Sequence, residues 1–208
     1  MIKKKPIFWS AAKKELKKKD KKLGKIIDKY HQDFLFSKSD PFLTLARSIV
    51  GQQISVKAAQ SVWEKLISKV KKISPKIIKD THTNQLKAAS LSRQKALYLK
   101  NLAYAFINND LKVNLWDKMN DDEIINDLIK IKGIGKWTAE MFLIFNLCRP
   151  DVLPLDDIGM IKGLCKIHNL KYPPKKEKII EIGQIWKPYR SVATWYLWRS
   201  LDPIPVEY

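Results

Sequence analysis

The stretch that decides the fold runs from Leu128 to Ala139 and reads LIKIKGIGKWTA. It predicts an amphipathic helix that enters a tight Gly-Ile-Gly turn and leads directly into a second helix. Two of the chain's seven glycines, Gly133 and Gly135, fall in this turn, where a left-handed backbone or a closely approaching ligand would require them. The amides of the turn and of the following helix start would form a pocket for an anion, and Lys136 would add positive charge.

Helical periodicity continues on both sides of this hairpin, and strand alternation hardly appears. Acidic residues at 121–123 predict the first turn of the hairpin's first helix, and the whole hairpin is expected at about 121–147. Start signals for further helices are Asp20, Asp40-Pro41, Ser55, Ser92 and Asp157. About nine or ten helices with short connections are expected, and the predicted fold class is therefore all-α.

The charge balance of the 208-residue chain points to a polyanionic partner. Its formal net charge is +19 and its pI is about 9.8, values typical of proteins that bind nucleic acid. A general abundance of lysine in the source is an alternative explanation for part of this excess. The twelve lysines of the first thirty residues also suit a solvated helix face as well as they suit DNA contact.

Several classes of protein do not fit the sequence. No apolar run approaches the length of a membrane-spanning helix, and the Lys-rich start lacks the apolar stretch of a signal peptide. We expect an intracellular protein that binds no membrane, cytoplasmic and at the nucleoid if the source is prokaryotic, and a monomer. The two cysteines and three histidines lack metal-ligand spacing, so neither a zinc centre nor a disulfide framework is expected.

Four segments together resemble one known family. They are residues 48–55 (SIVGQQIS), residues 91–96 (LSRQKA), the hairpin continuing through residues 152–157 (VLPLDD), and residues 186–198 (WKPYRSVATWYLW). The chain resembles the helix-hairpin-helix base-excision DNA glycosylases, and within them the 3-methyladenine DNA glycosylase II branch. The segments follow the family's order and cover most of the chain, whereas a Gly-Ile-Gly turn alone occurs in many DNA-binding proteins.

The resemblance implies two helical subdomains with an active-site cleft between them. A central subdomain, residues 41–150, would contain the hairpin. Residues 1–40 and 151–208 would form the second subdomain, which would carry the catalytic aspartate.

Asp157 is the candidate for catalysis. By its position alone it would cap the next helix, and capping explains such an aspartate. The resemblance places it on the family's catalytic aspartate, with Asp156 as the competing candidate. When a base leaves its sugar, positive charge develops on the sugar, and a fixed carboxylate stabilises that charge and can orient or deprotonate the attacking water. An N-alkylated purine is already cationic, so its departure needs little help from a general acid.

By the resemblance, the residues of the base pocket are Trp137, Trp198 and Met141. Core packing explains most tryptophans equally well, whereas stacking and cation–π attraction would favour a charged base. Met141 departs from the family pattern, because a better-known relative has a pocket tyrosine there. Trp137 takes the place of the nucleophilic lysine of relatives that also cut the DNA strand, which argues against Schiff-base chemistry.

Two segments are expected to contact DNA. In the hairpin, the residues facing phosphate would be Gly133, Ile134, Gly135, Lys136 and Thr138. The resemblance implies that a loop before them in sequence fills the gap left by a rotated nucleotide, and the residues of this loop are Gln52, Gln53 and Ile54. Gln53 is the main candidate for the inserted side chain, and a plain polar connection between two helices is an equal alternative.

The resemblance also bears on bound ions. In the family, carbonyls of the hairpin turn bind a monovalent cation, Na⁺ or K⁺, and the corresponding residues are Ile129, Ile131 and Ile134. No cysteine follows Cys165, so the iron–sulfur cluster of other hairpin glycosylases is not expected, nor is another cofactor. Arg190 has two alternatives, a phosphate contact or an ion pair with an acid.

The implied function is that of a monofunctional DNA glycosylase without lyase activity. It would flip alkylated purines out of damaged duplex DNA and hydrolyse their N-glycosidic bond, chiefly at 3-methyladenine, with 7-methylguanine as a further candidate. One alternative is the same fold acting on a deaminated or oxidised base. Another is a non-catalytic hairpin protein that binds DNA.

Overall fold

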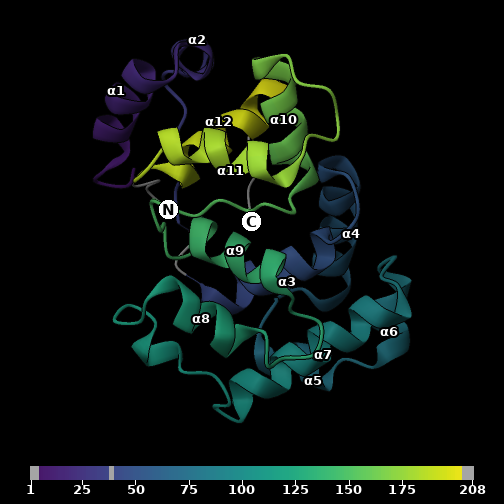
Figure 1. Ribbon diagram of the computed structural model, residues 1–208. Helices are drawn as coiled ribbons and strands as arrows, with labels where there is room; N and C mark the ends of the chain where they lie inside the picture. The colour runs from purple at the N-terminus through teal and green to yellow at the C-terminus, as the bar shows by residue number, and fades with distance from the viewer. Residues whose placement is uncertain (1–4, 38–39, 203–208) are drawn as a thin grey trace. The chain divides into compact units, whose positions relative to one another are not determined.

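Helices form all of the regular secondary structure in the described part of the chain (Figure 1). The computed structural model describes residues 5–37 and 40–202, and within them it has twelve α-helices, one short 3₁₀ helix and no strand. The all-α prediction is confirmed. The structure has more helices than expected because α5 (Pro75–Asp80) and α6 (Thr83–Ala88), with six residues each, are too short to show a helical period.

The described residues belong to two compact units. Unit 1 consists of residues 5–37 and 143–202, and unit 2 of residues 40–142. The sequence prediction set the second boundary at residue 150, whereas the structure has it after Phe142, inside α9 (Lys136–Phe145). A continuous helix carries no local mark of a boundary, so the sequence gives no signal there.

Unit 1 is built around aromatic side chains. Its helices are the end of α9 and α1 (Trp9–Lys19), α2 (Lys21–Lys29), α10 (Ile158–His168), α11 (Lys176–Ile185) and α12 (Arg190–Leu201). The largest side chains of its core are Trp9, Trp186, Trp195 and Tyr196. α10 packs closely on α12 at Gly163, where a Cβ atom would lie only 2.5 Å from the carbonyl oxygen of Leu197.

Asp20 connects α1 to α2 and caps α2. Its Oδ1 accepts the backbone N–H groups of Lys22 and Leu23, both at 3.0 Å, which confirms the predicted cap. Its Oδ2 accepts the indole N–H of Trp186 at 2.9 Å and lies 3.2 Å from Nε2 of His168. Burial alone would raise the pKa of Asp20, but the neighbouring His168, the Leu23 amide and the Trp186 indole outweigh it and lower the pKa to about 2.

Unit 2 contains most of the hairpin. Its helices are α3 (Pro41–Gly51), α4 (Val56–Val70), α5, α6, α7 (Arg93–Ile107), the 3₁₀ helix Val113–Leu115, α8 (Asp121–Leu128) and the start of α9. The predicted caps are present, because the side chains of Asp40, Ser55 and Ser92 accept backbone N–H groups in the first turns of α3, α4 and α7. At the start of α8, Asn120 and Glu123 form a reciprocal capping box.

A row of aromatic rings runs through unit 2. The ring centroids are 5.3 Å apart for Phe42 and Phe106, 6.4 Å for Phe106 and Trp116, and 4.9 Å for Trp116 and Phe142. All three pairs are T-shaped, the arrangement that aromatic quadrupoles favour. Since the rings come from α3, α7, the segment before α8 and α9, the row ties the second helix of the hairpin to helices distant in sequence.

Both cysteines belong to unit 1 and are free thiols. Cys148 follows α9, and Cys165 lies in α10. Burial raises the pKa of the Cys148 thiol to about 11 and also raises the pKa of Cys165.

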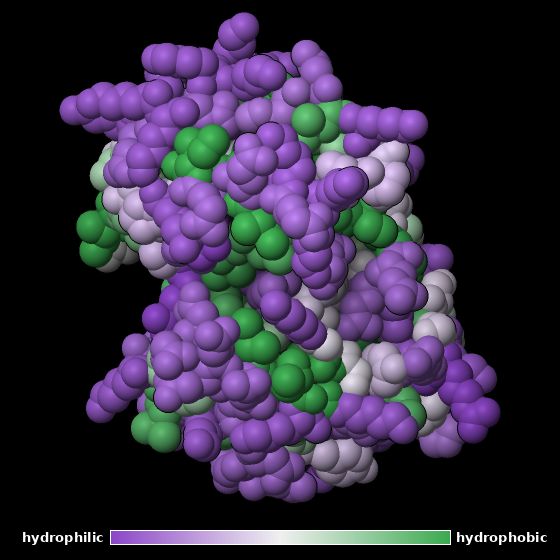
Figure 2. Space-filling model, viewed as in Figure 1, coloured by the Kyte–Doolittle hydropathy of each residue, from purple (hydrophilic) through white to green (hydrophobic). Residues whose placement is uncertain are grey.

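Polar side chains dominate the face shown in Figure 2, as expected of a chain in which 29% of residues are charged. Among the helices that the structure describes, none is both long enough and apolar enough to cross a membrane.

Candidate active site and nucleic-acid interface

Asp157 is a buried N-cap with a second hydrogen bond from another helix. Its Oδ1 accepts the backbone N–H of Met160 at 2.5 Å, the bond that caps α10. The same oxygen accepts the indole N–H of Trp198, on α12, at 2.8 Å. Only 8% of Asp157 is exposed. The predicted cap is confirmed, and the two donors fix the carboxylate in one orientation.

Two residues that the sequence analysis did not single out surround this pair. Gly159 leaves room for it, because a Cβ there would lie 3.1 Å from Cδ1 of Trp198 and 3.2 Å from Oδ1 of Asp157. Phe145 stacks on the Trp198 indole with centroids 5.5 Å apart and an interplanar angle of 13°. The available sequence signal for Gly159 was its position two residues after a capping aspartate. Phe145 has no local signal.

Asp156, the competing aspartate, is placed very differently. Its side chain is 68% exposed, and its Oδ1 lies 3.5 Å from Nζ of Lys176. An exposed carboxylate paired with a lysine is screened by water and is free to change rotamer. Of the two aspartates, Asp157 is therefore the one with a fixed orientation.

The hairpin turn needs its first glycine for two reasons. Gly133 has a φ of 110°, which favours glycine, and a Cβ there would lie 2.2 Å from the ring of Tyr98 on α7. The turn closes through a hydrogen bond of 2.9 Å from the N–H of Ile134 to the carbonyl of Ile131. Gly135 has a different setting, since a Cβ there would meet no protein atom within 4 Å.

Side-chain amides hold the carbonyls of this turn. Asn101 on α7 donates to the carbonyl of Lys132 at 3.0 Å. Gln52 donates from Nε2 to the carbonyl of Gly133 and to the hydroxyl of Thr138, each at 2.9 Å. Gln52 and Thr138 were both expected to contact DNA, and the structure engages their side chains with each other, with Thr138 almost fully buried.

We call the segment Gln52–Ile54 the insertion loop. Gln52 is half-buried, whereas Gln53 and Ile54 are exposed. Gln53 has a φ of 57°, a left-handed conformation that few non-glycine residues adopt. The structure thus presents Gln53 and Ile54 to solvent beside an anchored Gln52.

The remaining predicted hairpin residues differ in exposure. The Ile134 side chain is buried, so its backbone is the part that could meet DNA. Nζ of the exposed Lys136 lies 3.9 Å from Oε1 of the buried Glu140. Trp137 is half-buried, and Met141, one turn later on α9, is fully buried. The pocket role of these two side chains stays a prediction.

Arg190 pairs with an acid, which settles the two alternatives left by the sequence. Its Nε and Nη2 donate to Oδ1 and Oδ2 of Asp151 at 2.7 and 2.9 Å, and Nη2 also donates to the Asp151 carbonyl at 3.0 Å. This bidentate geometry joins the segment before Asp157 to the first residue of α12.

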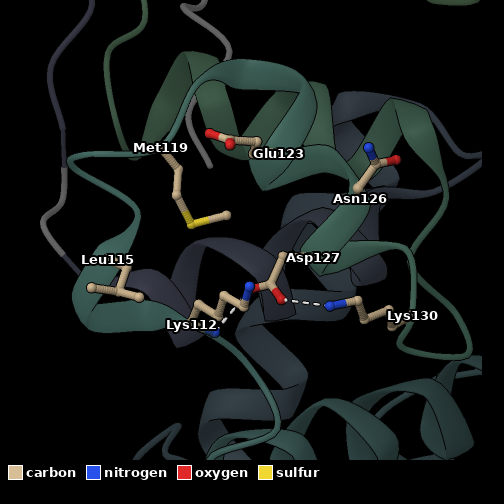
Figure 3. Close-up of a pocket in the computed structure, with 7 residues that line it drawn as sticks. All are labelled: Lys112, Leu115, Met119, Glu123, Asn126, Asp127 and Lys130. Atoms are coloured by element: carbon tan, nitrogen blue, oxygen red, sulfur yellow. Dashed lines mark hydrogen bonds and ion pairs between the residues drawn. The ribbon is translucent and has the colours of Figure 1, made fainter.

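A hollow of about 300 Å³ opens elsewhere on unit 2 (Figure 3). Its lining residues are Lys112, Leu115, Met119, Glu123, Asn126, Asp127 and Lys130, none of which is a predicted site residue. Asp127 accepts the Lys112 amide at 2.8 Å and the Trp116 indole at 3.0 Å, and it pairs with Lys130 at 3.1 Å. Burial would raise the pKa of Asp127, but these partners lower it. The charge thus stabilises the packing of α8, the first helix of the hairpin, on the segment before it.

Backbone carbonyls are the predicted ligands of a monovalent cation. Ile129 is the C-cap of α8, where helix carbonyls carry partial negative charge, and the Ile131 carbonyl accepts the turn-closing bond. Neutral carbonyl oxygens near a helix end are a donor set that fits Na⁺ or K⁺. Within the described residues, no group of three or more His, Cys, Asp or Glu side chains is arranged to hold a metal.

A known protein family matches most of the chain. Residues 46–188 match the HhH-GPD superfamily of base-excision DNA repair proteins, a range that includes the insertion loop, the hairpin and Asp157. The chain belongs to the HhH-GPD superfamily.

This HhH-GPD chain is 33% identical over 188 residues to DNA-3-methyladenine glycosylase 1 of Schizosaccharomyces pombe, covering 86% of this chain and 81% of that protein. Its fold matches the structure of the S. pombe 3-methyladenine DNA glycosylase in complex with abasic DNA, with a TM-score of 0.82, 31% identity, and coverage of 91% and 95%. An 8-oxoguanine glycosylase/lyase of Clostridium acetobutylicum has a TM-score of 0.78 at 19% identity, covering 91% and 68%, which shows the shared fold.

Proposed function

We propose that this protein is a monofunctional DNA glycosylase that removes alkylated purines, chiefly 3-methyladenine and also 7-methylguanine, from duplex DNA. The observation that carries the proposal is the buried Asp157 carboxylate, fixed on one oxygen by the Met160 amide and the Trp198 indole. Relatives named as 3-methyladenine glycosylases support the choice of lesion.

Asp157 would act on the sugar rather than on the base. As the bond between C1′ and the purine nitrogen breaks, its electron pair goes to the base and positive charge develops on the sugar, which the fixed carboxylate stabilises. Asp157 then orients a water molecule, which adds to C1′ and gives one proton to the Asp157 carboxylate. A cationic alkylpurine leaves as a neutral base, so the reaction needs no separate general acid.

Recognition of the lesion would combine charge with shape. Trp137, Trp198 and Met141 are proposed to line the pocket for the flipped base. Stacking of a cationic base on an indole contributes roughly 0.5–2 kcal/mol, whereas a neutral purine gains less. Trp198 is well suited to this role because its bond to Asp157 and its stacking on Phe145 fix the indole plane.

We expect no lyase chemistry because of Trp137. An indole cannot form the Schiff base that strand cleavage by a glycosylase requires. The neighbouring Lys136 is exposed, and its Nζ lies 3.9 Å from a carboxylate oxygen of Glu140.

The hairpin would hold the DNA backbone without reading sequence. The open space around Gly135 allows a phosphate to approach the amides at the start of α9, where the helix dipole favours an anion. A monovalent cation held by the carbonyls of Ile129, Ile131 and Ile134 would add positive charge beside that phosphate. The protein would act as a monomer inside the cell, at the nucleoid in a prokaryote.

A panel of duplexes tests the proposal. Each carries one lesion, 3-methyladenine (as a stable analogue), 7-methylguanine, hypoxanthine, uracil or 8-oxoguanine, and released base is measured by chromatography. We expect release from the alkylated duplexes alone, with abasic sites left uncut until alkali is added. Release of a deaminated or oxidised base instead would reassign the substrate, and no release from any duplex would favour a non-catalytic DNA-binding protein.

A further inference from the structure

Gln52 connects the insertion loop to the hairpin turn within unit 2. It is the C-cap of α3 and the first residue of the insertion loop. Its Nε2 donates to the carbonyl of Gly133 and to the hydroxyl of Thr138, each at 2.9 Å. A primary amide nitrogen has two N–H donors, so these bonds use its full donor capacity.

The two acceptors lie on either side of the start of α9. Gly133 belongs to the turn, and Thr138 belongs to the first turn of α9 and is almost fully buried. Asn101 holds the preceding carbonyl, that of Lys132, at 3.0 Å. Two successive carbonyls of the turn are therefore fixed by side-chain amides from two other elements of unit 2.

These bonds determine how the turn presents its own amides. In a trans peptide the C=O and the following N–H point in opposite directions. The N–H of Gly133 therefore points away from Asn101, and the N–H of Ile134 points away from Gln52 and closes the turn onto Ile131. A turn with fixed peptide planes can bind a phosphate without first being ordered.

The insertion loop is anchored at its first residue and strained at the next. Gln53 is exposed and has a left-handed φ of 57°. Such a conformation persists only where the surrounding structure holds it. The anchored side chain beside it is that of Gln52.

We propose that Gln52 is a positioning residue that fixes the insertion loop and the hairpin turn at one spacing. The grip on phosphate and the entry of Gln53 into the duplex then occur together. This inference rests on the proposed function. Gln52 then forms hydrogen bonds within the protein instead of the expected DNA contact. Gln53 and Ile54 are the loop residues that would contact DNA.

The substitution Gln52→Met tests this, because methionine has a similar length and no donors. Hydrogen exchange at the amides of residues 130–136 is measured without DNA, and nucleotide flipping is followed by 2-aminopurine fluorescence next to the lesion. We expect faster exchange, and flipping and single-turnover base release reduced about tenfold, as the loss of two neutral hydrogen bonds implies. Binding to undamaged duplex should also weaken, because the hairpin turn must then be ordered before it can hold a phosphate.

Two further variants separate this role from general destabilisation. Gln85→Met places the same change on an exposed side chain of α6 and should alter none of these readouts. Thr138→Val removes one of the two acceptors, so its effect and that of Gln52→Met should not add. Additive losses in the double variant, or unchanged exchange at 130–136, would overturn the inference.

The exchange measurement needs no catalysis, and this keeps the two proposals distinguishable. The unaltered protein could release no base while amide exchange at residues 130–136 still depends on Gln52. That result would contradict the glycosylase assignment and retain the positioning role of Gln52. Normal base release by Gln52→Met would instead retain the glycosylase and remove the positioning role.

Discussion

The indole N–H of Trp198 donates to Oδ1 of Asp157 at 2.8 Å and so joins α12 to the first turn of α10. Since the capping bond from Met160 ends on the same oxygen, the carboxylate cannot rotate without losing both donors. The packing of α10 against α12 thus fixes the orientation of the Asp157 side chain, which is proposed to face the sugar.

Asp157→Asn should lower base release from alkylated DNA by at least about a hundredfold, because a fixed charge is lost from the reacting centre. Asparagine also caps helices well, so the melting temperature should change little. Single-turnover release and DNA binding are measured together. Asp156→Asn is the matched control and should stay within about twofold of the unaltered protein. Equal losses in the two variants would contradict the assignment of Asp157.

Trp198→Phe should keep an aromatic ring stacked on Phe145 and remove the donor to Asp157. A hydrogen bond to a charged group contributes about 1.5–3 kcal/mol, so base release should fall at least about tenfold at saturating DNA. The affinity for an abasic duplex should remain. Unchanged base release by a folded Trp198→Phe variant would contradict the proposal that the indole orients Asp157.

The two glycines of the hairpin turn should respond differently to alanine. Gly133→Ala forces a Cβ against Tyr98 at a positive φ and should lower the free energy of unfolding by more than about 1 kcal/mol. Gly135→Ala meets no protein atom and should leave stability unchanged while weakening DNA binding. Thermal unfolding and fluorescence anisotropy measure the two effects. Unchanged affinity in Gly135→Ala would mean that no phosphate approaches there.

Asp20 should make stability depend on acid pH. Its folded pKa of about 2 lies below the unfolded value near 4, so its stabilisation is present above about pH 4 and is lost as the pH falls towards 2. The full effect is about 2 kcal/mol. Urea unfolding at a series of pH values should show a shallower dependence between pH 4 and 2 in Asp20→Asn. Identical curves for the two proteins would contradict the lowered pKa.

Binding to undamaged duplex should weaken steeply as salt rises, because phosphate contacts release counterions. Each contact contributes about 0.9 to the slope of log K against log salt, so Lys136→Ala should reduce the slope by about 1. Lys18→Ala, on an exposed position of α1, distinguishes the two views of the lysine-rich start. An unchanged slope there indicates a solvated face, and a reduced slope indicates DNA contact.

Local chemistry explains what the sequence predicted well. Asp40, Ser55, Ser92 and Asp157 cap helices with their own side chains, and the signal for each lies within a few residues. The turn glycines and the acidic start of α8 have the same local character. The family resemblance, rather than any spacing, selected Asp157 as the catalytic candidate.

Contacts between distant segments explain what was missed. Gln52 and Gly133 are 81 residues apart, so no local pattern shows that the amide of one holds the carbonyl of the other. The sequence could not choose between a phosphate contact and an ion pair for Arg190 for the same reason, because its partner Asp151 is distant in sequence. The Trp198 ring beside Gly159 belongs to another helix, so the sequence around Gly159 does not show this contact.

The two free thiols have a consequence for survival under chemical stress. Electrophiles attack the thiolate, and a thiol with a pKa raised above its ordinary range, as at Cys148 and Cys165, stays protonated at neutral pH. A repair protein of the proposed kind works while methylating agents are still in the cell. Slow reaction at its own sulfur atoms would let it outlast the exposure that creates its substrates.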